Sequence, residues 1–299
     1  MIGHISSIVR LGVFIKLYTA QSPSELHHHQ ENRMSPVIST VEAGVAHVRL
    51  NRPDKRNAID DETFDLLATA LESCRDDSEL LAVVLSGEGA SFCAGMDFSM
   101  HTSFADEADE GERPFADPDS PESEGKRVPG RGQRIVRAMR DSPVPVIVAV
   151  HGHAIGAGLQ LALGADIRIA APNALLGQRE IDFGLTVDMG ASQLLPRLVG
   201  PDRAFDLITT GRLVTGTEAM TIGLVTRLDD DPIEASLQVA RNIAERNPHA
   251  IKESKRLVRL AETASVTDGM HEEPPVMSSN IGSSLQVEAT RRYFAARAR

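Results

Sequence analysis

Residues 145–170, PVIVAVHGHAIGAGLQLALGADIRIA, decide the fold class of this chain. Pro145 to Val150 is a short, unbroken apolar run, which is typical of a buried strand, and Asp166 to Ala170 predicts a second strand. Between them, a glycine-punctuated turn from Gly152 to Gly158 precedes Leu159 to Gly164, an apolar segment that predicts a short helix. Alternation of strands and helices on this scale favours an α/β fold with a single main core.

The same alternation continues on both sides of this stretch. Val45 to Leu50 alternates apolar and polar residues as a half-buried strand does, and Asp60 or Asp61 is a candidate N-cap for a helix through Ser73. The other elements that local patterns predict are strands at 80–85, 174–176 and 224–228, and helices near 132–140, 191–199, 201–210, 217–222, 233–246, 249–262 and 286–298. Helix content therefore rises toward the C-terminus.

Composition divides the chain into three parts. Residues 1–33 show poor periodicity, and Met34 stands just before the first strand, so we expect a disordered extension at 1–33. We expect residues 34–225 to form the core domain and residues 226–299 to form a helical region. Within the core, residues 100–130 are acidic, rich in Pro and Gly and poor in aliphatic side chains. They predict a mobile insertion, which could be a solvated linker or a lid over a site.

The negative net charge of the chain bears on the kind of partner that it can bind. Its 299 residues carry a formal net charge of −11, which argues against nucleic acid or an anionic membrane surface as the main partner. No apolar run is long enough to cross a membrane. The two cysteines, Cys74 and Cys93, lack CxxC spacing. We therefore expect reduced thiols in a cytoplasmic protein that has no metal site.

Two glycine- and alanine-rich turns could carry chemistry. They are SFCAGMD at 91–97 and HGHAIGAG at 151–158. Small residues let backbone approach a ligand closely, and the helix expected after the second turn leaves its first N–H groups free to bind an anion. Glycines after a strand are also common turn formers. GAGLQL lacks the third glycine of a dinucleotide-binding fingerprint, and the chain contains no P-loop.

Four motifs, in a fixed order along the chain, together identify a protein family more specifically than any one of them alone. They are LNRPDKRNAID at 50–60, SFCAGMDF at 91–98, the stretch 145–170, and LLGQREIDFGLTVDMGASQLLPRLVG at 175–200. From about Val41 to Glu262 the chain resembles the enoyl-CoA hydratase/isomerase (crotonase) family. The resemblance implies a spiral of ββα units with a C-terminal helical region that joins subunits into a homotrimer or a dimer of trimers.

The resemblance also implies roles for individual residues. The backbone N–H groups of Met96 and Ala157 would form an oxyanion hole around the thioester oxygen of an acyl-CoA. The family's second turn usually carries three consecutive glycines, and Ala157 stands at the middle one. Residues that would lie along the CoA or substrate are Asp54, Lys55, Arg56, Asn57, Ala58, Ala94, Gly95, Asp97 and Gly158. Coenzyme A would be part of the substrate, and no separate cofactor is expected.

Three side chains are candidates for proton transfer: Gln160, Glu180 and Asp188. Hydratases of this family hold a water between two glutamates, at positions that match Gln160 and Glu180. A glutamine can orient water but cannot take its proton. A Glu and an Asp at the spacing of Glu180 and Asp188 resemble the dienoyl-CoA isomerase branch. The alternatives are a solvated Glu180 beside Arg179 and an Asp188 that caps the next helix.

Two histidines of the second turn, His151 and His153, are spaced as in a metal-binding HxH pair, but no further ligands accompany them, so satisfied polar contacts are the preferred interpretation.

Together these features favour an enzyme that isomerises or hydrates a fatty enoyl- or dienoyl-CoA. A non-catalytic acyl-CoA-binding member of the same fold and an acyl-CoA hydrolase are the alternatives, since fold resemblance alone does not separate these chemistries.

Overall fold

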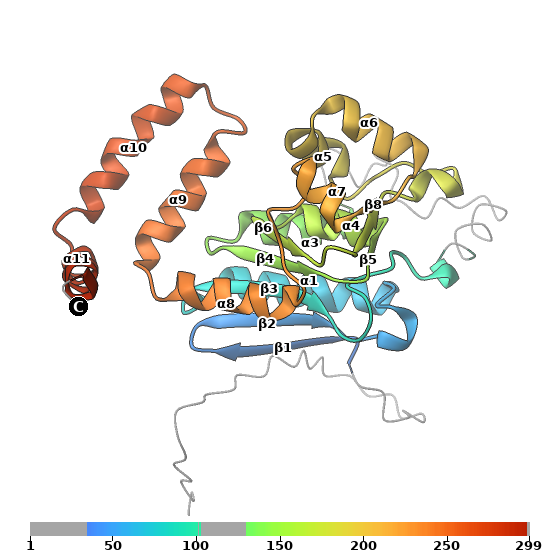
Figure 1. Ribbon diagram of the computed structural model, residues 1–299, viewed down its shortest axis with the longest axis horizontal. Helices are drawn as coiled ribbons and strands as arrows, with labels where there is room; N and C mark the ends of the chain where they lie inside the picture. The colour runs from blue at the N-terminus through green and yellow to red at the C-terminus, as the bar shows by residue number, and fades with distance from the viewer. Residues whose placement is uncertain (1–34, 101, 103–129, 298–299) are drawn as a thin grey trace, which may run out of the picture.

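The computed structural model describes residues 35–100, 102 and 130–297 (Figure 1). The expected extension at 1–33 and nearly all of the expected insertion at 100–130 lie outside the described residues. The described chain is an α/β fold in which helices cover both faces of a large sheet and three helices follow at the C-terminal end.

The large sheet has the strand order β1-β2-β3-β4-β6-β9. β1 and β2 are antiparallel, and the remaining neighbours are parallel. Its strands are β1 (Val37–Glu42), β2 (Val45–Leu50), β3 (Ala82–Gly87), β4 (Val146–Val150), β6 (Ile167–Ala170) and β9 (Arg227–Leu228). Every residue of β3 and β4 is buried, as their unbroken apolar runs predict for central parallel strands.

A small sheet stands beside the large one and consists of β5 (His153–Ile155), β7 (Leu175–Gly177) and β8 (Val214–Thr215). Each of two consecutive passes of the chain contributes one strand to each sheet and then a helix: β4, β5 and α4 (Ala157–Leu163), followed by β6, β7 and α5 (Ala191–Val199). These are the ββα units of the expected spiral.

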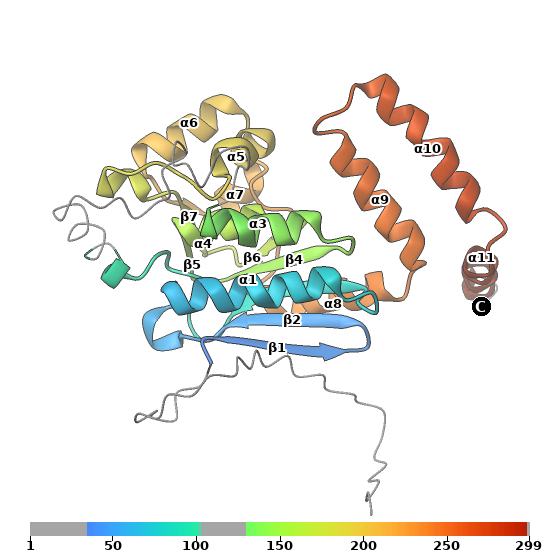
Figure 2. The same cartoon turned by 180° about the vertical axis from the view of Figure 1, so that it is seen from behind.

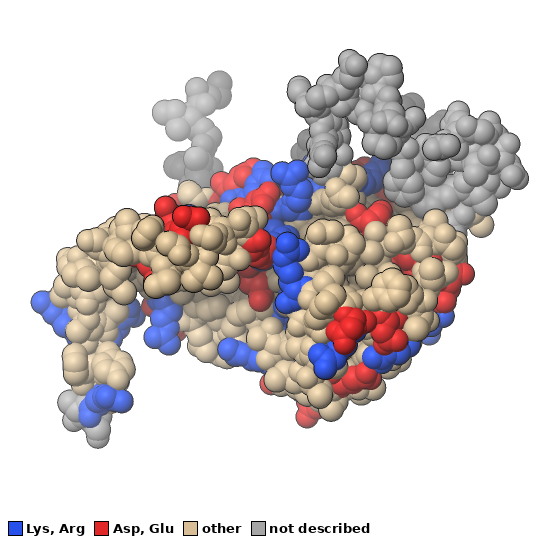
Figure 3. Space-filling model, turned by 90° about the horizontal axis from the view of Figure 1, so that it is seen from above, with Lys and Arg blue, Asp and Glu red and all other residues tan. Residues whose placement is uncertain are grey.

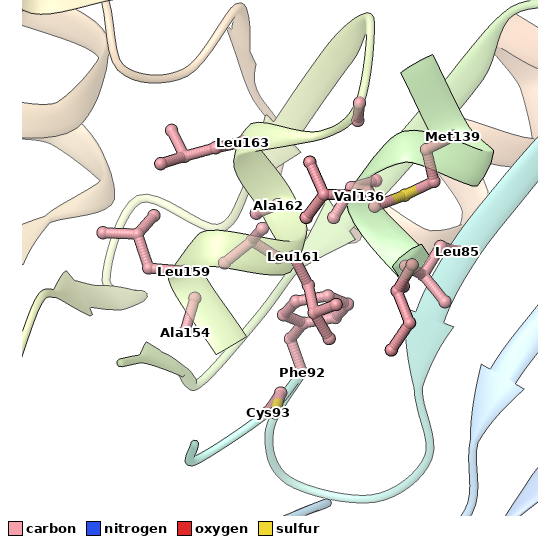
Figure 4. Close-up of a cluster of buried hydrophobic side chains, with 14 of the residues drawn as sticks. Leu85, Phe92, Cys93, Val136, Met139, Ala154, Leu159, Leu161, Ala162 and Leu163 are labelled. Carbon is pink, nitrogen blue, oxygen red and sulfur yellow. The ribbon is translucent and has the colours of Figure 1, made fainter. Parts of the chain in front are cut away.

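Helices pack on both faces of the large sheet, and the hydrophobic core lies between the sheet and these helices. α1 (Asp61–Asp76) and α3 (Arg131–Asp141) lie side by side on one face, and α8 (Pro232–Ala244) lies on the other (Figures 1 and 2). α1 begins where its N-cap predicts, because Asp60 accepts a hydrogen bond from the Thr63 N–H at 3.0 Å. Figure 4 shows side chains of α3 and α4 gathered with Leu85 of β3 and with Phe92.

The other helices near the core are α6 (Pro201–Thr210) and α7 (Gly216–Thr221), both close to their predicted bounds. Four predictions need correction. β5 and β8 were missed, since strands of two or three residues carry no periodicity of their own. The six-residue strand β1, VISTVE, was missed because its apolar residues do not alternate with polar ones. The predicted strand at 224–228 is reduced to Arg227–Leu228, because Leu224 and Val225 instead end the α7 turn with bonds to Ala219 O.

Three helices form a C-terminal arm: α9 (Pro248–Leu260), α10 (Val266–Asn280) and α11 (Ser284–Arg297). The arm stands away from the sheet in Figures 1 and 2, and none of its residues is buried. α10 was not predicted, because Pro274 and Pro275 lie inside it and proline normally breaks a helix. No helix among the described residues is long and apolar enough to cross a membrane.

α9 is tied to the core by partly buried ion pairs around Asp166. One oxygen of its carboxylate accepts from Lys255 at 2.8 Å and from the Val146 N–H at 2.8 Å, and the other accepts from Arg259 at 2.7 Å. Lys255 also donates to the carbonyl of Val144 at 2.9 Å. Burial lowers the pKa of the Lys255 ammonium, and Asp166 opposes that shift. The first helix of the arm is therefore fixed to the beginning of β4.

Candidate active site

Two cavities stand out among the described residues. One of about 360 Å³ lies beneath α9, where its charged lining residues Asp166, Lys255 and Arg259 are bonded to one another. The other, of about 730 Å³, contains most of the residues singled out from sequence. Its wall is made by Asp54, Lys55, Arg56, Ala58, Ala94, Gly95, Met96, Asp97, Phe98, His153, Ile155, Gly156, Arg179, Glu180, Asp182, Phe183, Leu185 and Leu213. The larger cavity is therefore the candidate active site.

Three extended segments lie side by side on one wall of this cavity. The segment around Ile59 pairs with the one around Met96, because the Ile59 N–H donates to Gly95 O and the Asp97 N–H donates to Ile59 O, both at 2.8 Å. The other edge of this middle segment pairs with β5, through the Cys93 N–H and His153 O at 2.9 Å. All three segments run in parallel, so their downstream ends meet at one place.

Met96 and Ala157 stand at those downstream ends. Among the described residues, neither backbone N–H donates to a protein acceptor, and the N–H of Ala157 is the first of α4, where a helix offers no partner. Two unpaired N–H groups at one end of a cavity can hold an oxygen that becomes negative during a reaction. Met96 lines the cavity, whereas the methyl group of Ala157 belongs to the hydrophobic core.

The glycines on either side of Ala157 are required by their surroundings. Gly156 has φ +53°, and a Cβ there would point at the Glu180 carboxylate, 3.4 Å from Oε1. A Cβ on Gly158 would lie 2.4 Å from the carbonyl oxygen of Cys93, so this glycine lets the two turns approach each other. Gly158 is buried and lies outside the cavity wall, so its side of the helix serves packing.

Glu180 is the carboxylate at the cavity wall. It begins a short 3₁₀ helix, Glu180–Phe183, directly after the strand β7. Gln160 of α4 donates from Nε2 to its Oε1 at 2.7 Å. In the amide orientation that satisfies its polar atoms, the fully buried Gln178 donates to Glu180 Oε2 at 3.0 Å. Burial raises the pKa of Glu180, the Gln160 bond partly offsets this, and the charge of Asp188 raises it further.

Asp188 lies within electrostatic reach of Glu180, and the Gln160 side chain also bonds it. Part of its surface is exposed, but the surrounding protein removes enough water to raise its pKa, and the Gln160 bond opposes that shift. The capping alternative is wrong: α5 begins at Ala191, its N-cap is Gly190, and no side chain caps it. Asp188 lies outside the described wall of the 730 Å³ cavity.

Gln160 is buried and held at both ends of its amide. Its Oε1 accepts from the Met189 N–H at 2.9 Å, and its Nε2 donates toward the two carboxylates. The Met189 bond fixes the oxygen as the acceptor end, so the nitrogen faces the acids. Gln160 therefore joins Glu180 and Asp188 without being able to exchange a proton with either.

The loop at 53–58 contributes Asp54, Lys55, Arg56 and Ala58 to the cavity wall. Lys55 and Arg56 are exposed there, and the Ala94 N–H donates to Arg56 O at 3.0 Å. Asn57, in contrast, is 1 % exposed and is turned away from the cavity. Its side chain bonds the Arg52 N–H at 2.8 Å and the carbonyls of Glu88 and Ser91 at 2.9 and 2.7 Å. Asn57 thus holds the loop, and its side chain does not line the site.

Asp97 lines the cavity but is already engaged. It accepts from Arg52 at 3.0 Å and from the Ser99 N–H and hydroxyl at 3.1 and 3.0 Å. These bonds lower its pKa, the Ser99 backbone bond contributing most. Asp97 therefore stabilises the segment that carries Met96.

Sequence reasoning missed several residues of this cavity. The apolar side chains Phe98, Phe183 and Leu213 line it, and the rings of Phe98 and Phe183 lie 6.4 Å apart. His153 lines it from β5, and Gln178, which directly follows β7, supports Glu180. The alternation of β5 offered a signal, since His153 and Ile155 share one face of that strand. No group of three or more His, Cys, Asp or Glu in the described chain could hold a metal ion.

In the view of Figure 3, acidic and basic side chains are interspersed over the part of the molecule shown. Lys55, Arg56 and Arg179 line the 730 Å³ cavity, and Arg179 is paired with Asp182.

The ββα spiral, with two unpaired N–H groups at the meeting point of its turns, defines a crotonase-like enzyme. The family model described as enoyl-CoA hydratase/isomerase matches residues 40–297, and the chain belongs to that family.

Known relatives include both kinds of enzyme. The chain is 34 % identical over 232 residues to the short-chain-enoyl-CoA hydratase of Clostridium acetobutylicum, covering 75 % of this chain and 81 % of the relative. It is 32 % identical over 261 residues to the mitochondrial Delta(3,5)-Delta(2,4)-dienoyl-CoA isomerase of Mus musculus, covering 84 % and 76 %. A crystal structure of an enoyl-CoA hydratase from Polaromonas sp. JS666 superposes with a TM-score of 0.74 at 26 % identity, covering 87 % of this chain and 97 % of that one.

Proposed function

We propose that this enzyme moves a carbon–carbon double bond in a fatty enoyl- or dienoyl-CoA by proton transfer between two carboxyl groups. The Gln160 contact carries the proposal: a carboxamide that cannot exchange a proton occupies the position between Glu180 and Asp188. Among the described residues, Glu180 and Asp188 are the titratable groups that this amide contacts, so they are the ones left to move protons there. Relatives of both types match the chain, so the side chains at the site decide between the two chemistries.

The proton balance of an isomerisation fits two carboxyl groups with raised pKa values. One carboxylate takes a proton from carbon, and the electron pair moves onto the thioester oxygen to give an enolate. The other carboxyl group, protonated, delivers a proton to a different carbon, and the double bond reforms one or more positions away. Burial raises the pKa of both Glu180 and Asp188, which brings each closer to the range in which it can give as well as take a proton.

The enolate would be stabilised by the backbone N–H groups of Met96 and Ala157. Loss of one such donor typically lowers the rate by about 10²- to 10³-fold in other enzymes. Both donors are backbone groups whose positions depend on the paired segments described above. A thioester oxygen placed there would have its reacting carbons beside Glu180, because Gly156 directly precedes Ala157 and faces that carboxylate.

The CoA part of the substrate would extend along the cavity toward Lys55 and Arg56. These two exposed cations line the same cavity as Glu180 and suit the phosphates of CoA. Asp54, Ala58, Ala94 and Gly95 also line the cavity and would contact the rest of the CoA arm. No cofactor is required in this scheme, because the thioester itself accepts the charge.

Hydration is the second candidate, because Glu180 could activate a water without a second carboxylate at position 160. It is favoured by the hydratase relatives. A non-catalytic acyl-CoA-binding protein and an acyl-CoA hydrolase remain the alternatives from other classes.

The deciding experiment incubates the pure protein with enoyl-CoA and dienoyl-CoA substrates in deuterated water and analyses the products by chromatography and mass spectrometry. Isomerisation gives a product with the substrate's elemental composition, a new retention time and deuterium at carbon. A product heavier by one water supports hydration instead, free CoA supports hydrolysis, and unchanged substrate with measurable binding supports the binding protein.

A further inference from the structure

His153 occupies a defined place on the wall of the proposed acyl-CoA site. It is the first residue of β5, and its ring shares the cavity face with Ile155, while Ala154 between them is buried in the core. Following the strand downstream leads from His153 to Gly156, beside Glu180. A strand rises about 3.3 Å per residue, so His153 stands upstream of the reacting end of the cavity by roughly two to three residues of strand.

The neighbours of His153 indicate that it lies between the reacting end of the cavity and the loop that carries Lys55 and Arg56. Its carbonyl accepts from the Cys93 N–H, and the next residue of that segment, Ala94, donates to the carbonyl of Arg56. His153, Ala94 and Arg56 are thus adjacent across the three paired segments, and Arg56 belongs to the cationic loop. An acyl-CoA molecule that extends from the backbone N–H groups of Met96 and Ala157 toward Arg56 would therefore pass beside His153.

The ring of His153 is held in one orientation by Ser91. The Ser91 hydroxyl lies 2.9 Å from Nδ1, and Ser91 is 1 % exposed. Within the described residues no other acceptor bonds that hydroxyl, so its hydrogen is assigned to Nδ1 and the ring proton to Nε2. Nε2 has no protein partner among the described residues and, unlike Nδ1 of His151, is not sealed from solvent. A fixed N–H donor therefore stands at the cavity wall.

We propose that His153 donates this hydrogen bond to the carbonyl oxygen of the first amide of the pantetheine arm, and so helps the site select thioesters that carry that amide. In acyl-CoA this amide lies two methylene groups beyond the thioester sulfur, which matches the short step from the oxyanion donors to His153. The phosphates lie much farther along the molecule, where Lys55 and Arg56 can meet them. The inference rests on the proposed acyl-CoA function.

Binding of three unreactive saturated thioesters tests the proposal. They are hexanoyl-CoA, the N-acetylcysteamine thioester of hexanoic acid, which keeps only the first amide, and S-propyl thiohexanoate, which has none. His153→Phe should weaken binding of the first two by about three- to tenfold, the usual effect of one neutral hydrogen bond, and leave the third unchanged. His153→Gln, which keeps a donor and an acceptor, should stay within about twofold of wild type for all three.

The controls separate the ring's contact from its structural role. His151→Phe changes the matched histidine of the same turn, which lies outside the cavity wall, and should leave all three affinities unchanged. If His153→Phe fails to fold, the double variant Ser91→Ala/His153→Phe removes the hydroxyl left without a partner.

Two results would overturn the proposal: an equal loss for all three thioesters, which indicates a structural role, and a loss confined to hexanoyl-CoA, which indicates a phosphate contact. Wild-type protein that binds hexanoyl-CoA but turns over no enoyl-CoA would refute the proposed isomerase and leave this comparison valid.

Discussion

Gln160 donates a hydrogen bond from Nε2 to Oε1 of Glu180 at 2.7 Å, and its own oxygen accepts from the backbone of Met189. The amide thereby orients the carboxylate without being able to share its proton chemistry. A glutamate at this position would present a second carboxylate to the same space. In the proposed mechanism, the identity of this one side chain separates a pair of carboxylates that activates water from a pair that moves protons between carbons.

Glu180→Gln should abolish turnover and leave acyl-CoA binding nearly intact. General acid–base help is typically worth about 10² to 10⁴ in rate, and the substitution keeps the side chain's shape and its contacts with neighbouring amides. The loss should appear in kcat, with KM close to wild type. Steady-state kinetics alongside calorimetric binding of a saturated acyl-CoA would check this. Unchanged turnover would defeat the catalytic assignment and favour the binding protein.

Gln160→Glu should increase hydration of a short enoyl-CoA at the expense of isomerisation. The new carboxylate can still accept from the Met189 N–H, so the side chain should keep its position. Beside Glu180 it adds a like charge, which should raise the pKa of Glu180 further and let one carboxyl group hold a proton while the other activates water. Loss of absorbance of the enoyl thioester measures hydration directly. Gln160→Met, which has no proton to exchange, is the matched control and should not gain hydration.

On the acidic side of the pH profile, kcat/KM should fall with a midpoint above the pKa of an ordinary carboxyl group. Burial and the charge of Asp188 both raise the pKa of Glu180, and the base must be ionised, so activity should rise as the pH passes that raised value. Asp188→Asn removes a negative charge that disfavours ionisation of Glu180. The midpoint should therefore move to lower pH while the rate falls by about 10²-fold or more, if Asp188 is the second proton carrier. A midpoint that moves to higher pH would contradict the assigned electrostatics.

Asp166→Leu should destabilise the protein by about 3 to 5 kcal/mol, because it leaves the buried Lys255 ammonium without its counter-charge. Lys255 is 8 % exposed and Asp166 19 %. The double variant Asp166→Leu/Lys255→Met should lose less free energy of unfolding than the two single variants lose in sum. Urea unfolding followed by circular dichroism measures both. Asp206→Leu breaks an exposed pair with Arg212 and should cost no more than about 1 kcal/mol.

Sedimentation should show a trimer or a hexamer. The C-terminal arm buries none of its residues in the single chain. Several of its large apolar side chains are more than half exposed: Val266, Met270, Met277, Ile281 and Phe294. Apolar side chains gathered on one segment are typical of a subunit interface. Ile281→Glu together with Met277→Glu should shift the protein toward monomer. A wild-type chain that sediments as a monomer at micromolar concentration would contradict the proposal.

Local sequence determined most of the elements of this protein. The unbroken apolar runs became central strands, the Asp60 cap started α1, and a helical period marked α3 and α8. These signals are local because a strand or helix of sufficient length must repeat its apolar residues to match its own geometry. Met96, Glu180 and four residues of the loop at 54–58, which the quoted motifs carry, line one cavity, and their catalytic and binding roles stay predictions.

Only the tertiary structure decided what each of these side chains contacts. Asn57 stands in the same motif as Arg56, yet its amide is turned to bond the nearby Arg52 N–H and the carbonyls of Glu88 and Ser91, which lie much farther along the chain. Gln178 reaches Glu180 from the residue after β7, and His153 reaches the cavity from β5, and both strands have only three residues. Asp188 lies beside Glu180, where no helix needs a cap from it. The physical reason is the same in each case: a hydrogen bond or a desolvated charge depends on partners that sequence spacing does not place, and the folded chain supplies them only when its distant segments pair.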